Sequence, residues 1–204
     1  MKFHLSFFWI FFFVLSIYSN VVKIYLIIFL LLLIHEMGHV FIALLFGYKV
    51  EKISIYPFGF SANIEHFNHL DPIKSIMILI GGIGFHLIFP FFFKLLYEMN
   101  LISYVFYEYL NHVNFSIFIF NLLPIFPLDG GRFLLSISRL FFNYRISKQI
   151  VQLISGIVIL IFLFYSPISM KIILIFIGFL LFIEIYRQEE DCVEYQYYQM
   201  SVLK

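Results

Sequence analysis

An apolar stretch from Leu26 to Phe46 constrains this chain more than any other part of it. It reads LIIFLLLLIHEMGHVFIALLF, and its one interruption is His35-Glu36-Met37-Gly38-His39. A run of about 20 mostly apolar residues is long enough for a helix that crosses a membrane. Residues four apart in a helix share a face, so His35 and His39 point the same way. Ionisable groups inside such a helix are costly without partners, and they usually serve a function.

The spacing of these polar residues indicates a metal site. Two imidazoles at positions i and i+4 of a helix can hold a zinc ion, and Glu36 lies beside the vacant coordination position. The HExxH pattern is short, however. A buried polar cluster that ties helices together, or a polar relay that lines a pore, would explain the same residues.

The composition places the chain in a membrane. Of its 204 residues, 63% are hydrophobic and 12% are charged, and the mean hydropathy is +1.00. Soluble domains are about half apolar and a quarter charged. A net charge of +1 without a dense Lys/Arg stripe argues against a nucleic-acid role. The single cysteine, Cys192, supports neither a disulfide framework nor a CxxC metal site.

Hydropathy predicts six membrane spans and hence an all-α polytopic membrane protein. The N-terminal segment has a Lys and an apolar core but no small-residue cleavage site, so we expect a retained helix there. We expect a six-helix domain over residues 1–186 and a short cytoplasmic tail over 187–204. The predicted spans are residues 4–19, 22–46, 72–96, 100–123, 150–166 and 169–186.

Basic residues predict the topology. With both termini in the cytoplasm, ten Lys and Arg residues lie in inner segments and three lie in outer segments. This distribution follows the positive-inside rule. It places the second half of the HEMGH helix towards the cytoplasm.

The segment between the second and third spans predicts a short membrane-proximal β-hairpin. Residues 52–56 alternate polar and apolar side chains, and Pro57-Phe58-Gly59-Phe60 is typical of a turn. An unpaired edge of the hairpin could accept an extended peptide by strand addition. A plain connecting hairpin explains the pattern equally well.

The segment from Asn121 to Arg132, NLLPIFPLDGGR, cannot continue as one helix because it holds two prolines and then Asp-Gly-Gly. Broken backbone at membrane depth is tolerated where it is buried or lines a wet cavity. Taken alone, Asp129 is best explained as the N-cap of the next helix. Because His35 and His39 leave a metal site unfilled, the interpretation of Asp129 as a ligand is favoured.

Other polar and small residues have structural explanations. Gly81 and Gly82 permit close helix packing, and we expect His86 to be packed and hydrogen-bonded rather than a ligand. Glu108 and His112 lie four apart and can pair. The basic, amphipathic stretch 133–149 is expected along the cytoplasmic interface.

The residue types predict a hydrolytic mechanism. His35, His39 and Asp129 would leave a fourth zinc position for water, and Glu36 would act as the general base. The amide of Asn121 could stabilise the oxyanion, although a hydrogen bond to backbone freed by Pro124 explains Asn121 as well. A metal transporter, or an inactive scaffold with the same ligands, is the alternative.

Four stretches together resemble the site-2 protease family of intramembrane zinc metalloproteases, and within it the sporulation branch. They are LLLIHEMGH (Leu31–His39), YPFGF (Tyr56–Phe60), NLLPIFPLDGGR and LFIEIYRQ (Leu181–Gln188). The resemblance implies zinc bound by His35, His39 and Asp129, Glu36 as the catalytic base, and six spans with the site towards the cytoplasm.

The resemblance also implies partners and a location. In the sporulation branch the substrate is a membrane-associated sigma-factor precursor, and inhibitory membrane proteins hold the protease silent. The expected location is a bacterial cell membrane, namely the mother-cell-derived membrane around the forespore. Membrane lipid is the remaining expected partner.

Overall fold

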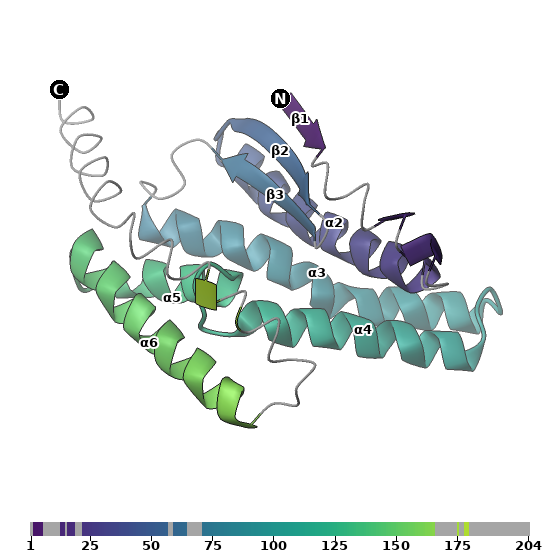
Figure 1. Ribbon diagram of the computed structural model, residues 1–204. Helices are drawn as coiled ribbons and strands as arrows, with labels where there is room; N and C mark the ends of the chain where they lie inside the picture. The colour runs from purple at the N-terminus through teal and green to yellow at the C-terminus, as the bar shows by residue number, and fades with distance from the viewer. Residues whose placement is uncertain are drawn as a thin grey trace. The chain divides into compact units, whose positions relative to one another are not determined.

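The computed structural model describes residues 2–5, 13–14, 16–18, 22–56, 59–64, 71–165, 175 and 178–179. The chain divides into two compact units, one of residues 1–67 and 77–120, the other of residues 68–76 and 121–204. Figure 1 labels the elements, which are β1 (Lys2–Leu5), α2 (Val22–Leu45), β2 (Val50–Tyr56), β3 (Gly59–Ile64), α3 (Pro72–Glu98), α4 (Tyr104–Leu122), α5 (Asp129–Ser138) and α6 (Tyr144–Tyr165).

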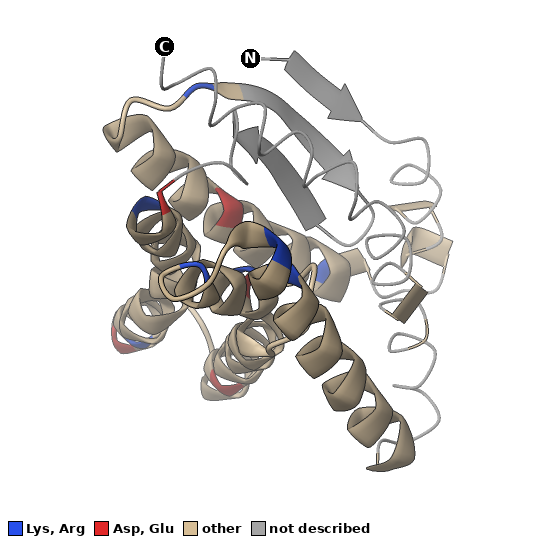
Figure 2. Cartoon of the chain, turned by 90° about the vertical axis from the view of Figure 1, so that its left-hand side faces the viewer, with Lys and Arg blue, Asp and Glu red and all other residues tan. Residues whose placement is uncertain are grey.

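Three of the described helices, α2, α3 and α6, are long and apolar enough to cross a membrane. Charged residues are sparse along the described helices (Figure 2). The predicted spans 22–46 and 72–96 correspond to α2 and α3. The predicted span 100–123 forms the helix α4, which is not among these three candidates. The predicted spans 4–19 and 169–186 fall largely outside the described residues.

The amphipathic stretch 133–149 is divided between two helices, and its placement along the cytoplasmic interface stays a prediction. Helix α5 ends at Ser138, and α6 begins at Tyr144. Asn143 caps α6, because its Oδ1 accepts a hydrogen bond from the Ile146 N–H at 2.9 Å. The span predicted to start at residue 150 therefore starts six residues earlier.

The ends of α2 and α3 follow from their terminal residues. Helix α2 stops before Gly47, which adopts the left-handed conformation (φ 78°) that favours glycine. Helix α3 begins at Pro72, and the Asp71 Oδ1 accepts a hydrogen bond from the Ile73 N–H at 2.8 Å. Proline in the first helical position and aspartate before it are favourable start signals.

A three-stranded sheet accompanies the helices of the first unit. Strands β2 and β3 pair antiparallel, with Ile53 opposite Ala62, in the segment where the sequence predicts a hairpin. Strand β1 pairs parallel with β2, which makes β2 the central strand. The pairing of β1 was not predicted. Strands β2 and β3 both contact α2 (Figure 1).

Helices α2 and α3 approach closely at glycines. A Cβ atom added to Gly38 would collide with the carbonyl of Gly81, and one added to Gly81 would lie 2.7 Å from the Gly38 carbonyl oxygen. Small residues let helix backbones come together in this way. The packing interpretation of the glycine run is confirmed. Away from the glycines, α2, α3 and α4 share a cluster of buried apolar side chains, which are Leu31, Phe89, Phe93 and Leu110.

The second unit has its own core, between the segment before α5 and the helices α5 and α6. Its buried members are Ile125, Phe126, Leu135, Tyr144, Val151 and Ile159. The core therefore packs the proline-broken segment directly against α6.

Replacing Gly81 with Ala should lower the thermal unfolding midpoint of the detergent-solubilised protein. The added methyl group cannot fit against the Gly38 carbonyl, and overpacking of this kind costs about 1–3 kcal/mol. Gly84→Ala is the matched control, because no atom of the described residues lies within 4 Å of its added Cβ. An unchanged midpoint for Gly81→Ala would contradict the close approach of α2 and α3.

Candidate metal centre

The two histidines of the HEMGH stretch lie side by side on α2. His35 and His39 are 2% and 5% exposed, and their Nε2 atoms are 3.1 Å apart. Their rings meet edge to face, with 4.7 Å between the centroids. The predicted sharing of one helix face is confirmed.

A backbone carbonyl fixes the proton on His39. The Nδ1 of His39 lies 2.9 Å from the carbonyl oxygen of Ile78 in α3. A carbonyl oxygen only accepts hydrogen bonds, so Nδ1 carries the proton and donates it. In the neutral ring, Nε2 then presents a lone pair, which is the atom that a metal ion requires.

Gly82 leaves the space that the His39 ring occupies. A Cβ atom at position 82 would collide with Cε1 and Nε2 of this imidazole. The ring of His39 thus lies against the bare backbone of α3, where its rotation is restricted.

The other ring nitrogen of His35 has a side-chain partner. His35 Nδ1 lies 3.1 Å from His86 Nε2, and His86 Nδ1 lies 2.7 Å from Asn114 Oδ1. His86 is therefore packed and hydrogen-bonded, as predicted. Its contact with His35 was not foreseen.

The spacing of the two Nε2 atoms suits a metal ion. Two nitrogens that each lie about 2.05 Å from a tetrahedral zinc ion are about 3.3 Å apart, close to the 3.1 Å found here. If both rings donate through Nδ1, two lone pairs face each other at this distance. A cation between them would turn that repulsion into attraction, so the residues present fit a bound zinc ion.

Glu36 follows the first histidine on α2 and is half-buried. One step along a helix turns the side chain by about 100°, so Glu36 lies beside the histidine face rather than on it. The role of Glu36 as the general base stays a prediction.

The segment before Asp129 is held by α6. The Phe126 N–H donates to Ser155 Oγ at 2.9 Å, and Ser155 Oγ donates to the Val151 carbonyl at 2.7 Å. Gly130 and Gly131 fit against the backbone of residues 122–126, where a Cβ on either would collide. The broken backbone is thus buried and hydrogen-bonded, as membrane depth requires.

Asp129 is the first residue of α5 and is 9% exposed. The N-cap position belongs to Leu128, whose side chain makes no capping hydrogen bond. The alternative explanation, that Asp129 is the cap, is therefore wrong. The positive end of the α5 dipole favours a negative carboxylate in the first turn.

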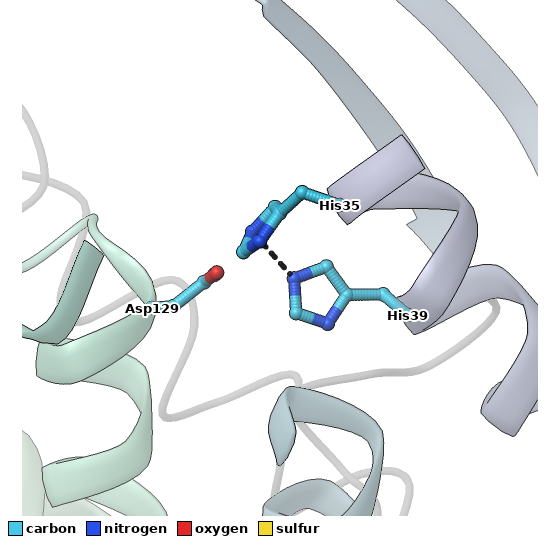
Figure 3. A group of neighbouring side chains, drawn as sticks. All are labelled: His35, His39 and Asp129. Carbon is cyan, nitrogen blue, oxygen red and sulfur yellow. Dashed lines mark hydrogen bonds between the residues drawn. The ribbon is translucent and has the colours of Figure 1, made fainter. Parts of the chain in front are cut away.

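The three predicted ligands are each buried, with the imidazoles of His35 and His39 in the first unit and the carboxylate of Asp129 in the second. Figure 3 shows the two imidazoles of α2, with a dashed line between their Nε2 atoms, and the carboxylate at the start of α5. One carboxylate and two imidazoles are a ligand set typical of catalytic zinc.

Other predicted residues are placed as follows. Asn121 is half-buried near the end of α4, and its assignment to the oxyanion stays a prediction. His112 and Glu108 pair at 3.8 Å on the exposed side of α4, as predicted. The polar tail with Cys192 lies outside the described residues.

Sequence reasoning missed Asn114 as part of this centre. Asn114 is 3% exposed, and its amide is bonded to both the ring and the backbone of His86. The available signal was its position as a polar residue in a predicted membrane span, which calls for a partner.

Comparison with known proteins identifies relatives of this chain. Peptidase family M50 matches residues 23–109 and 96–165. Stage IV sporulation protein FB of Bacillus subtilis is 32% identical over 120 residues, which are 59% of this chain and 42% of that protein. A zinc metalloprotease of Methanocaldococcus jannaschii is 30% identical over 172 residues, 80% of this chain and 49% of that protein.

The chain thus spans less than half the length of these two curated relatives. The solved structure of a site-2 protease from M. jannaschii is similar, with a TM-score of 0.64 and 28% identity. That similarity covers 93% of this chain and 90% of the solved one. The family match extends over most of the chain and includes both the HEMGH helix and the Asp129 segment, so the chain belongs to peptidase family M50, the family of the site-2 proteases.

Proposed function

We propose that this protein is an intramembrane zinc metalloprotease that cleaves a membrane-associated protein near the cytoplasmic face of the membrane. The observation that carries the proposal is the buried pair of imidazoles on α2, whose Nε2 atoms lie 3.1 Å apart and next to Glu36. The membership in peptidase family M50 supports the same reaction class.

In this proposal, His35 and His39 bind zinc through Nε2, and Asp129 is the third ligand. The burial of all three side chains supports the assignment. When bound, zinc polarises the scissile carbonyl and makes water a nucleophile near neutral pH. Glu36 takes the proton from the attacking water and passes it to the leaving amine. Asn121 donates a hydrogen bond to the developing oxyanion.

The wider arrangement belongs to the same proposal. We expect six spans, both termini in the cytoplasm and the metal centre on that side, as the basic residues indicate. The similarity to a stage IV sporulation protein supports a sporulation role in a bacterial membrane. The substrate would then be the pro-sequence of a sigma factor, and inhibitory membrane proteins would be partners.

A metal transporter or an inactive scaffold is the competing function. Both would use the same ligands, but neither needs a base beside the metal. Glu36 is therefore the residue that separates a protease from these two classes.

Glu36→Gln should abolish proteolysis of a co-expressed membrane-tethered sigma-factor precursor while zinc remains bound. General base catalysis contributes about 10²–10⁴-fold to a rate, so cleavage by the variant should fall by at least that range. Immunoblots follow cleavage, and elemental analysis of the purified protein follows zinc. Glu98→Gln is the matched control, since Glu98 lies exposed at the end of α3 and pairs with Lys94. Normal cleavage by Glu36→Gln would overturn the mechanism.

The metal-free protein should bind one zinc ion per chain in a competition with a chromophoric chelator. His35→Ala, His39→Ala and Asp129→Ala should each weaken binding by more than about 100-fold, because each removes a ligand. Asp129→Cys should retain binding, since a thiolate can replace the carboxylate.

The exposed His112 of α4 supplies the control for this measurement, and His112→Ala should bind zinc like the wild type. Wild-type affinity in Asp129→Ala would remove Asp129 from the ligand set. Wild-type affinity in His35→Ala and His39→Ala would overturn the metal centre itself.

A further inference from the structure

A line of hydrogen bonds leads from the backbone of α3 to the imidazole of His35. His86 and Asn114 form it, and neither belongs to the predicted ligand set or the catalytic groups. His35, His86 and Asn114 are only 2%, 2% and 3% exposed. Buried polar groups inside an apolar bundle carry a cost that their hydrogen bonds must offset, so this line calls for an explanation.

The line begins at the carbonyl of His86, to which Pro90 cannot donate the usual helical hydrogen bond. In an α-helix the carbonyl of residue 86 would accept the N–H of residue 90, but proline has none. Asn114 Nδ2 donates instead, to the His86 carbonyl oxygen at 2.9 Å. Because a carbonyl only accepts, the amide must turn its NH₂ group towards it, and Oδ1 must face the His86 ring.

This orientation of the Asn114 amide determines which ring nitrogen carries the proton in His86 and then in His35. Asn114 Oδ1 accepts from His86 Nδ1 at 2.7 Å, so the neutral His86 ring presents a lone pair at Nε2. His86 Nε2 in turn accepts from His35 Nδ1 at 3.1 Å. His35 is thereby held as the tautomer whose Nε2 lone pair faces His39.

We propose that His86 and Asn114 are positioning residues that fix the tautomer and ring orientation of His35 for zinc binding. The inference rests on the proposed function, since it assigns these residues to the zinc ion of that centre. The partners of metal-bound histidines act in this way in general, and their loss costs 10–100-fold in metal affinity.

The two ligands differ in how they are oriented. His39 is held by the main-chain carbonyl of Ile78, which no substitution removes. His35 is held by two side chains, and both can be replaced. The inference is therefore open to a direct test on the His35 side.

The test compares two substitutions of His86 in the full-length, detergent-solubilised protein. His86→Leu removes the acceptor for His35 Nδ1–H, whereas His86→Gln supplies an amide oxygen in its place. Chelator competition with Zn²⁺ should give a 10–100-fold weaker affinity for His86→Leu. His86→Gln should bind with an affinity close to that of the wild type.

Asn114 gives a second pair. Asn114→Leu should weaken Zn²⁺ binding, and Asn114→Asp, which keeps an acceptor for His86 Nδ1–H, should restore most of it. The visible absorption of bound Co²⁺ reports ligand geometry, and its bands should shift in both leucine variants but not in Asn114→Asp or His86→Gln. The thermal midpoint of the metal-free variants separates this effect from a loss of folding.

Two results would overturn the inference. One is wild-type Zn²⁺ affinity in His86→Leu, and the other is an equal loss of affinity and midpoint in His86→Leu and His86→Gln, which would indicate a packing role. If His35→Ala loses zinc and His86→Leu does not, only this inference fails. If His35→Ala keeps zinc, the proposed metal centre fails with it.

Discussion

The close approach of α2 and α3 at Gly38 and Gly81 is the constraint on which the metal centre depends. Because the two backbones nearly touch there, one helix can supply hydrogen-bond partners to both imidazoles of the other. Ile78 and His86 lie on either side of the glycine contact, about two turns apart along α3. They reach His39 and His35 respectively. A wider separation of the helices would disconnect both rings at once.

Backbone carbonyls decide where the protons of this centre lie. The carbonyl of Ile78 sets the proton of His39 directly, and the carbonyl of His86 sets that of His35 through Asn114 and the His86 ring. With these tautomers, the two Nε2 atoms, 3.1 Å apart, turn their lone pairs towards each other. In an apolar environment, where electrostatic interactions are strong, this arrangement favours a cation over no ion. The backbone carbonyls of Ile78 and His86 therefore prepare the two imidazoles of the first unit to bind a metal ion.

Much of the helical fold and part of the site could be predicted from the sequence. Long apolar runs located α2 and α3, and helical spacing paired His35 with His39. The start of α6 was missed because Asn143 sets it by capping, while hydropathy reports only the apolar portion. Asn114 was missed because its contact with His86 joins residues 28 apart on different helices, and periodicity within one helix does not give the register between two. The roles of Asp129 and Asn121 stay predictions.

The missing side chain of Gly82 has a consequence for how the protein's essential residues are recognised. The imidazole of His39 occupies the volume that a Cβ at position 82 would fill. The position of this imidazole therefore depends on the absence of a side chain at Gly82. A genetic screen for inactive variants would place Gly82 beside the ligands, although it offers no group to metal, water or peptide. Gly82 would be essential only because it leaves space for the His39 ring. The set of residues that the centre requires is therefore larger than the set that takes part in the chemistry.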